Sequence, residues 1–444
     1  MNRFLILLLL VSGILSQSKK AIITLYNDGY GLIRQPVNFQ VQIGSNNFSY
    51  PNLPARIEPG SVFLSISEGT IINQKYNNNV YDTFSFLNSS LGTNVTLKMK
   101  GSKSVKGRLI DVDNRWLSVK SKNQVHILNM SEVIEVASNN KINNLSIAPS
   151  MEWEIKSAAS GKINGEIVYI SGGFVWNANY RLIISPDEKQ GKLITQAEVS
   201  NNTTEDFIGA SLQLVEGDLR RRPNNGGSQQ PRIALQTKRK NENSFNLESS
   251  GDFVLYTLLE PLALPKNESI TVSLYSDAEV KLDRTYVFEN EEKVKSEQPL
   301  SIEISFTNRE QNLDVPLPAG ILQIYQRTDN KGIIFAGEDF LPQTATGEDV
   351  TVVAGRAFNV LGKRTVMNYD RKKKSEEATI LLELNNKRKD DINIRLIEHI
   401  FGDWVIKDPS HDYRKMDSET IQFDIMMKGS SSETVTYTYR KEWQ

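Results

Sequence analysis

Apolar and polar residues alternate along most of this 444-residue chain beyond residue 16, and this period of two most constrains its fold. Residues 301–306 and 434–439 show the alternation most clearly, with an apolar side chain at every second position. Asp28-Gly29 separates two early runs, and this dipeptide between alternating segments is typical of a β-hairpin turn. The sequence therefore predicts an all-β protein built from antiparallel strands and turns.

A short helix and a compact set of strands interrupt the longer strands. Val80, Phe84, Leu87 and Leu91 lie at helical spacing, and a glycine follows them. Five short strands follow between residues 95 and 136, which predicts a small SH3-like or Sm-like barrel. Its strands are basic and would suit RNA, but they lack interleaved aromatic residues, so we interpret the basic side chains as a solvated face.

Changes in pattern divide the chain into five parts. The last two are interpreted as tandem antiparallel β-sandwiches of the immunoglobulin or fibronectin-III type. The polar, basic segment 220–250 predicts a disordered loop, although such a loop would also suit an acidic polymer or a processing enzyme. The predicted parts are a signal peptide (1–16), N-terminal strands packing with the central sandwich (17–80), a helix plus small barrel (81–148), the central sandwich (149–290) and the C-terminal sandwich (291–444).

The N-terminus has the order of a secretory signal peptide. Arg3 provides a basic start, residues 4–11 are an unbroken apolar run, and Ser16 offers a small-residue cleavage site. The apolar run is short for a bilayer-spanning helix, although a single anchoring helix is the alternative. We therefore expect the mature chain to begin near Gln17 and to be secreted, to the extracellular space or, in a bacterium, to the periplasm.

Composition excludes several classes of function. The formal net charge of −1 provides no electrostatic attraction toward nucleic acid. The chain has no cysteine, which excludes a thiol nucleophile, a thiolate metal site and a lipid anchor on an N-terminal cysteine. No apolar run beyond residue 16 reaches the length of a membrane span, so we expect no transmembrane segment in the mature chain.

Asparagine is abundant, and eight Asn-x-Ser/Thr triplets occur in the chain. In a eukaryotic host these triplets are candidate glycosylation sites on the surface, whereas in a bacterium they carry no meaning. The candidates are Asn47, Asn88, Asn94, Asn129, Asn144, Asn201, Asn202 and Asn267.

No familiar reaction centre is present in the sequence. His126, His399 and His411 form no His-x3-His or His-Glu-x2-His pair, so a histidine-built zinc site is not expected. A Gly-x-Ser-x-Gly nucleophile elbow and a glycine-rich phosphate loop are also absent from the sequence. The best acidic pairs are Glu338-Asp339 and Glu348-Asp349, which turn geometry explains more simply than catalysis. We therefore predict no catalytic residue, no metal and no cofactor.

Residues 171–181 form the densest group of small and aromatic residues. Gly172-Gly173 permits a tight bend or a close approach of two backbone segments. Trp176 and Tyr180 then have two interpretations. They could form a binding platform that stacks on sugar rings or grips a peptide, or they could fill a core, which is the interpretation we favour.

A weak internal repeat supports tandem sandwiches. The pattern Asn-x3-Asp-x-Ile-x3-Leu begins at Asn202 and recurs at Asn386. A strand precedes each copy, and a Gly-Asp dipeptide follows each, at Gly217-Asp218 and Gly402-Asp403. We interpret the shared element as strand, Asn-rich turn and strand, and coincidence between two hairpins with the same turn chemistry is the alternative.

Several motifs together resemble one protein family. They lie at residues 25–29, 54–62, 169–182, 199–218, 316–325, 337–339, 355–358, 402–404 and 437–439. In these motifs the chain is similar to the domain of unknown function 4139, which occurs in mucoidy-inhibitor-A-like proteins, over nearly the whole mature length. It lacks the long coiled-coil segment that many relatives carry near the N-terminus. The resemblance implies a β-rich architecture and a link to surface polysaccharide, with no defined reaction or catalytic residue.

The sequence thus predicts an exported, non-enzymatic β-sandwich protein that binds or scaffolds at the cell surface or outside the cell. The expected ligand is an extracellular or envelope protein or polysaccharide. The alternative is a hydrolase that uses carboxyl groups on a polysaccharide or peptide. A deep cleft with two carboxyl groups at glycosidase separation would favour the hydrolase, and solvated acids on a shallow surface would favour binding.

Overall fold

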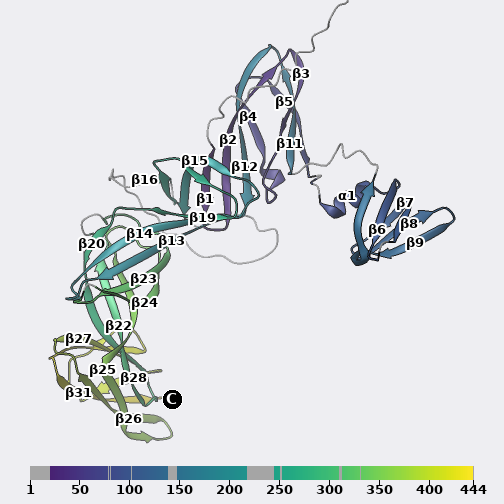
Figure 1. Ribbon diagram of the computed structural model, residues 1–444. Coiled ribbons are helices and arrows are strands. Elements are labelled where there is room, and N and C mark those ends of the chain that lie inside the picture. The colour runs from purple at the N-terminus through teal and green to yellow at the C-terminus, as the bar shows by residue number, and fades with distance from the viewer. Residues whose placement is uncertain are drawn as a thin grey trace, which may run out of the picture. The chain divides into compact units, whose positions relative to one another are not determined.

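The computed structural model describes residues 21–78, 80, 82–101, 103–138, 148–217, 245–250, 253–309, 313–330 and 332–443 (Figure 1). The described chain is nearly all β, with several antiparallel sheets, as the alternation predicts. It divides into two compact units. The first comprises Met1–Val175, Ser200–Gln213 and Pro261–Ser269, and the second comprises Trp176–Val199, Leu214–Glu260 and Ile270–Gln444.

One sheet of the first unit has the strand order β15-β1-β2-β12-β4, and β18 pairs with β15. Gly29 has φ +83° in the turn between β1 and β2, which confirms the predicted hairpin. A smaller sheet has the order β3-β11-β5. The bounds are β1 (Ile22–Tyr26), β2 (Tyr30–Val41), β3 (Gly44–Tyr50), η1 (Pro59–Ser61), β4 (Phe63–Ile66), β5 (Thr70–Asn77), β11 (Ser150–Ser157), β12 (Gly161–Gly172), β15 (Phe207–Glu216) and β18 (Leu262–Leu264).

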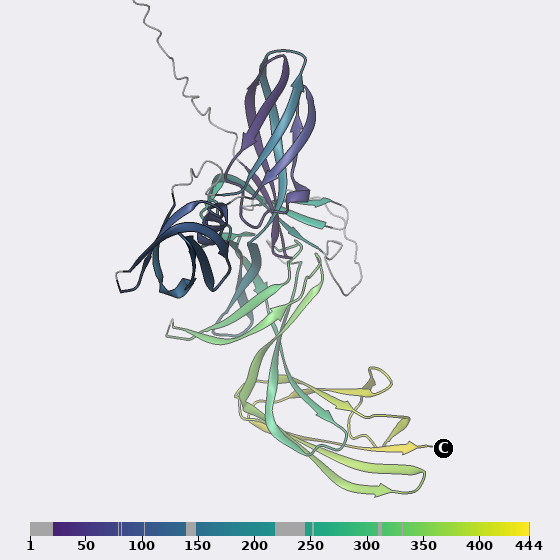
Figure 2. The ribbon, with the colours of Figure 1, turned by 90° about the vertical axis from the view of Figure 1, so that its right-hand side faces the viewer.

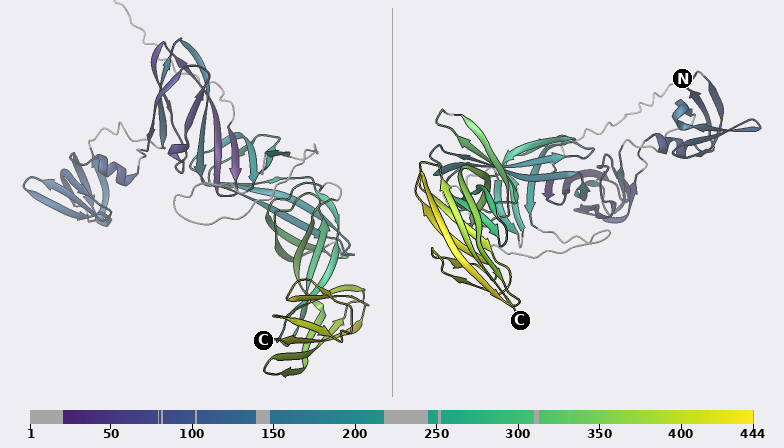
Figure 3. Two further views of the ribbon diagram at one scale, coloured as in Figure 1. Left: turned by 180° about the vertical axis from the view of Figure 1, so that it is seen from behind. Right: turned by 90° about the horizontal axis from the view of Figure 1, so that it is seen from below.

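A helix and five short strands form a small half-barrel (Figure 3). The helix α1 (Thr83–Ser89) begins after Asp82, whose carboxylate accepts a hydrogen bond from the Ser85 amide at 2.8 Å. Of the predicted helical stripe, Leu87 is buried against the strands, whereas Phe84 and Leu91 are exposed. The strand order is β10-β6-β7-β8-β9, with bounds β6 (Asn94–Met99), β7 (Ser104–Val112), β8 (Trp116–Ser121), β9 (Gln124–Asn129), η2 (Met130–Glu132) and β10 (Val133–Ser138).

A six-stranded sheet has the order β19-β14-β13-β23-β24, and β20 pairs with β14. β13 and β23 run parallel, and Gly320 faces Ala178 in their register. A Cβ atom at Gly320 would lie 2.1 Å from the Ala178 carbonyl oxygen, so glycine is required for this close pairing. The bounds are β13 (Phe174–Ile184), β14 (Gln190–Asn201), β19 (Glu268–Ser273), β20 (Ala278–Lys281), β23 (Gly320–Arg327) and β24 (Ile333–Leu341).

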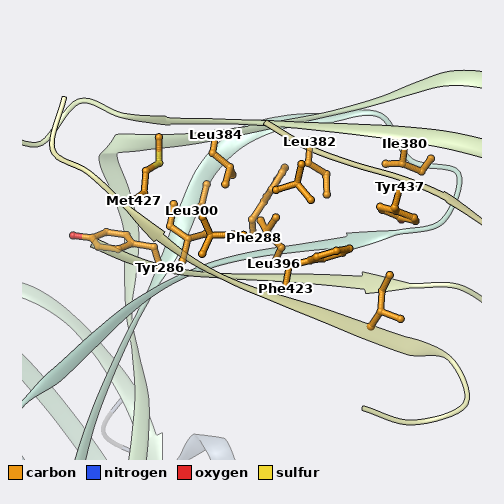
Figure 4. Close-up of a cluster of buried hydrophobic side chains, with 14 of the residues drawn as sticks. Tyr286, Phe288, Leu300, Ile380, Leu382, Leu384, Leu396, Phe423, Met427 and Tyr437 are labelled. Carbon is orange, nitrogen blue, oxygen red and sulfur yellow. The ribbon is translucent and has the colours of Figure 1, made fainter. Parts of the chain in front are cut away.

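The C-terminal part of the second unit is a nine-stranded sheet of order β28-β31-β26-β25-β22-β21-β27-β30-β29. Its inward side chains form a core of 21 buried hydrophobic residues, in which Leu382 and Leu384 lie across from Phe288 and Leu396 (Figure 4). The bounds are β21 (Asp283–Glu291), β22 (Ser296–Thr307), β25 (Asp349–Arg371), β26 (Ser375–Asn386), β27 (Ile392–His399), β28 (Trp404–Lys407), β29 (Arg414–Lys415), β30 (Thr420–Met427) and β31 (Ser431–Glu442).

The predicted disordered loop over residues 220–250 is wrong at its C-terminal end. Phe245–Ser250 is strand β16, which pairs antiparallel with β17 (Phe253–Leu258). The partner strand supplies backbone donors and acceptors that the composition of the segment does not reveal. The rest of that loop, the predicted signal peptide and Asn144 lie outside the described residues.

Candidate functional site

The candidate site is a hollow of about 430 Å³ on the nine-stranded sheet, where β21 and β22 separate. The two strands pair from Asp283↔Ser305 to Val287↔Ser301, and the last of these pairs, together with residues beyond it, lines the hollow. β27 pairs with β21, and β25 pairs with β22, so both also contribute to the wall. The lining residues are Val287, Glu289, Asn290, Glu291, Val294, Ser296, Gln298, Pro299, Ser301, Arg356 and His399.

His399 stands between two side chains at one edge of the hollow. Its Nε2 atom lies 2.7 Å from Glu289 Oε1, and its Nδ1 atom lies 3.1 Å from Thr420 Oγ1. A carboxylate accepts hydrogen bonds, so Nε2 is the donor toward Glu289, and Nδ1 forms the second hydrogen bond with the threonine hydroxyl. The imidazole is thereby fixed in orientation. The Glu289 side chain is 59% exposed, so this carboxylate is solvated.

Asn290 is the most deeply buried polar residue of the hollow, with 5% of its surface exposed. Its Oδ1 atom accepts a hydrogen bond from Ser296 Oγ at 2.6 Å. Its side chain also forms a hydrogen bond with the buried Glu398 carboxyl, and it lies on the same face of β21 as the core residues Tyr286 and Phe288. Asn290 therefore belongs to the buried polar network behind the hollow.

Arg356 contributes a positive charge on the opposite side of the hollow. Its Nη1 atom donates to Gln298 Oε1 at 2.9 Å, which orients the guanidinium. The register between β25 and β22 shifts between Pro299 and Ser301, which form pairs with Leu361 and Arg356, respectively. This β-bulge gives Arg356 its place at the hollow, because a bulge redirects the side chains beside it.

A buried ion pair supports the wall from the core side of the sheet. Arg364 Nε donates to Glu398 Oε2 at 2.8 Å, and Tyr437 Oη donates to the same carboxyl at 2.5 Å. Arg364 Nη1 also donates to the Val294 carbonyl at 2.7 Å, which fixes a backbone segment that lines the hollow. Burial raises the pKa of Glu398, and the Arg364 charge opposes that rise. Loss of either partner would leave an unpaired buried charge.

The acidic pairs singled out in the sequence do not lie at the hollow. Both carboxylate oxygens of Asp339 accept from backbone amides, those of Phe340 at 2.8 Å and Val353 at 2.7 Å. Glu348 accepts from the Ala345 amide at 3.0 Å beside a turn, as the turn interpretation predicts. Glu338 and Asp339 instead lie within β24 next to a β-bulge, so for this pair the turn interpretation is wrong.

The binding platform considered for Trp176 and Tyr180 is wrong, because both side chains are buried. Trp176 is 3% exposed and packs edge-on against Tyr256, with ring centroids 6.4 Å apart. Tyr180 Oη donates to the Pro318 carbonyl at 2.6 Å, and burial holds the pKa of this phenol well above its usual value. Gly173 has φ +98° and begins the bend that precedes them, as predicted. These residues fill a core.

One candidate glycosylation site is also wrong. Asn201 is fully buried, and its Nδ2 atom donates to the Glu205 carbonyl at 2.9 Å and to the Leu264 carbonyl at 2.8 Å. A glycan would have to be attached at this same nitrogen, so Asn201 cannot carry one in the folded protein. The side chains of the other described candidates are exposed, namely Asn47, Asn88, Asn94, Asn129, Asn202 and Asn267.

The remaining histidines lie away from the hollow. His126 is half-buried in β9 of the half-barrel. His411 Nε2 lies 3.6 Å from Glu433 Oε1, in a second, more open depression formed by residues 409–413. Within the described ranges, no group of three or more His, Cys, Asp or Glu side chains has the arrangement of a metal site.

Sequence reasoning named His399 but missed its neighbours Glu289, Asn290 and Arg356. Alternation along β21 indicates that residues 289 and 291 share a face. The approach of His399 depends on the parallel pairing of β21 with β27, in which Glu291 faces His399. That pairing joins segments about a hundred residues apart, and nothing in the local sequence indicates it.

No protein-family profile matches the chain, and no curated protein matches it. Among the helices of the described segments, none has the length and apolar character needed to cross a membrane.

Proposed function

We propose that the chain is an exported, non-enzymatic β-sandwich protein whose hollow at β21 and β22 binds a polar ligand at the cell surface or outside the cell. The observation that carries this proposal is the set of polar and charged side chains that line the hollow. They provide the imidazole of His399, the guanidinium of Arg356 and the carboxylates of Glu289 and Glu291. Such a set suits the hydroxyl and amide groups of a sugar unit or a peptide.

The exposure of the acids favours binding over hydrolysis. Glu289 and Glu291 are both exposed, and they lie two residues apart on one strand. A glycosidase needs two carboxyl groups on opposite sides of the scissile bond, one of them kept protonated by dry surroundings. Neither feature is met by two solvated acids on the same strand. Export is supported by the order of charge, apolar run and small residue at the N-terminus.

The surface role agrees with the resemblance to the domain of unknown function 4139, because the name of the mucoidy-inhibitor-A-like proteins records a surface-polysaccharide phenotype. N-terminal sequencing of secreted protein tests export, with Gln17 expected near the start. Recovery of the chain with Met1 intact in a membrane fraction would contradict it.

An array of defined oligosaccharides and short peptides tests the hollow. The variants His399→Ala and Arg356→Ala should each bind more weakly the ligands that the unaltered protein retains. The affinity should fall about tenfold, as expected for the loss of a charge-assisted hydrogen bond. His411→Ala is the matched control, because it removes another histidine–glutamate pair away from the hollow. Equal binding by all four proteins would refute the assignment. Release of cleaved products, abolished in Glu289→Gln, would favour the hydrolase instead.

A further inference from the structure

We propose that the turn between β25 and β26 binds an acidic polysaccharide. Four consecutive cations occupy it, Arg371, Lys372, Lys373 and Lys374, and we call residues 371–374 the basic turn. All four side chains are exposed. Figure 2 shows the β25–β26 hairpin at one end of the nine-stranded sheet.

The positive charge of the basic turn is only partly neutralised. Lys372 Nζ lies 3.3 Å from Asp370, and Arg371 Nε lies 4.0 Å from Glu376. Neither Lys373 nor Lys374 forms an ion pair with any described residue.

The acids on the neighbouring strands are themselves paired with other cations. Glu377 pairs with Lys407 at 3.1 Å, and Glu442 with Arg440. The ammonium groups of Lys373 and Lys374 are thus left for a ligand.

The basic turn is held in one conformation by Trp443. The indole Nε1 atom donates to the Lys373 carbonyl at 3.2 Å, and the Trp443 amide donates to the Lys374 carbonyl at 3.1 Å. The Arg371 guanidinium lies over the same ring, 5.8 Å from its centroid. Because the backbone is already ordered, the turn loses less conformational entropy on binding than a flexible basic loop would.

The chemistry of the turn indicates the ligand class. Unpaired ammonium groups attract carboxylate or sulfate, and Trp443 remains 38% exposed, so its indole offers an apolar surface to a sugar ring. Nucleic acid is negatively charged, as acidic polysaccharides are. A protein outside the cell, however, encounters acidic glycans rather than nucleic acid. The choice of polymer, though not the location of the site, therefore rests on the proposed function.

Binding to four probes over a range of NaCl concentrations tests the proposal with the full-length protein. The probes are dextran sulfate, polygalacturonate, neutral dextran and single-stranded DNA. We expect the two acidic polysaccharides to bind and neutral dextran not to bind. In Lys373→Gln/Lys374→Gln, affinity should fall about tenfold or more, and the slope of log affinity against log salt should decrease by about two, one for each lysine removed.

A matched control has the same change in charge. Lys387→Gln/Lys389→Gln neutralises two exposed lysines in the turn after β26, and it should leave affinity nearly unchanged. Equal losses in the two double variants, or no loss in either, would overturn the proposal. Tighter binding of DNA than of both acidic polysaccharides would overturn the ligand class. His399→Ala should keep polyanion binding, so failure at the hollow and failure at the basic turn are distinguishable.

Discussion

Two turns, one in each unit, are held by a buried asparagine in the same way. Asn201 Nδ2 donates to the carbonyl four residues on, that of Glu205, and to the carbonyl of Leu264. Asn386 Nδ2 donates to the carbonyl four residues on, that of Asp390, at 3.0 Å and to a second distant carbonyl, that of Lys428, at 2.9 Å. In both turns the asparagine Oδ1 accepts from the backbone amide two residues on. The asparagine amide thus ties the end of one strand to a distant segment.

The repeated contacts are offset by one residue from the repeat seen in the sequence. The sequence pattern aligns Asn202 with Asn386, whereas the hydrogen bonds align Asn201 with Asn386. Asn202 is exposed, and Asn201 lies at the last residue of β14, just as Asn386 ends β26. A comparison of residue types alone does not show which of two adjacent asparagines faces the core. The comparison teaches that burial, and not residue spacing alone, defines the repeat.

The two anchors themselves should give the largest effect. Asn201→Ala and Asn386→Ala each remove two hydrogen bonds from the asparagine amide to backbone carbonyls and one from a backbone amide to its Oδ1, which should lower stability by about 2–4 kcal/mol. Asn202→Ala is the matched control and should change stability by less than about 0.5 kcal/mol. Urea unfolding of the three variants measures this. A larger loss for Asn202→Ala than for Asn201→Ala would restore the register of the sequence pattern.

A third turn tests how far the comparison extends. Asn308 is fully buried and donates to the carbonyls of Val315 at 2.8 Å and Ala345 at 2.9 Å, but its Oδ1 atom forms no hydrogen bond with any described residue. Asn308→Ala should therefore cost less than the first two variants, about 1–3 kcal/mol, because one unsatisfied atom is removed with the two bonds. The same unfolding measurement applies. A cost above that of Asn386→Ala would show that the missing Oδ1 contact is unimportant.

Thr203 distinguishes the two matched turns from each other. Its Oγ1 atom donates to Asn201 Oδ1 at 2.7 Å and accepts from the Glu205 amide at 3.2 Å, whereas the matched residue Arg388 uses only its backbone amide on Asn386. Thr203→Val should lower stability by about 1 kcal/mol. Arg388→Ala should cost no more than the partly exposed ion pair with Glu188 provides. Thermal unfolding checks both, and equal stability of Thr203→Val and the unaltered protein would refute a role for the hydroxyl.

Glycosylation gives the smallest expected change in stability and the sharpest distinction between adjacent residues. Asn201 and Asn202 both begin an Asn-x-Thr triplet, but only Asn202 presents its amide to solvent. In protein secreted from a eukaryotic host, peptide mass spectrometry should place any glycan of this pair on Asn202. A folded, secreted form with a glycan on Asn201 would contradict the buried position of that side chain.

The sequence predicted the kind of structure well and the sites poorly. Alternation correctly identified the strands that became β22 and β31, because a half-buried strand leaves its period in the sequence. The half-barrel followed from the density of short strands. The hollow could not be predicted, since Glu289, Arg356 and His399 come from strands whose pairing is set by backbone hydrogen bonds between distant segments. The prediction of a disordered loop up to Ser250 was wrong for the same reason, because β16 is ordered by its pairing with β17.

The position of β1 within its sheet has a consequence during synthesis. β1 lies between β2 and β15, and Thr24 Oγ1 donates at 2.8 Å to Oε1 of Gln213, which lies 189 positions further along the chain. At translation rates of roughly 5–20 residues per second, β1 waits on the order of 10–40 s after its own synthesis before β15 exists. Throughout that interval one edge of β1 can pair with any other strand, including one from a neighbouring nascent chain. The yield of correctly folded protein should therefore depend on how crowded the chains are while they are being made.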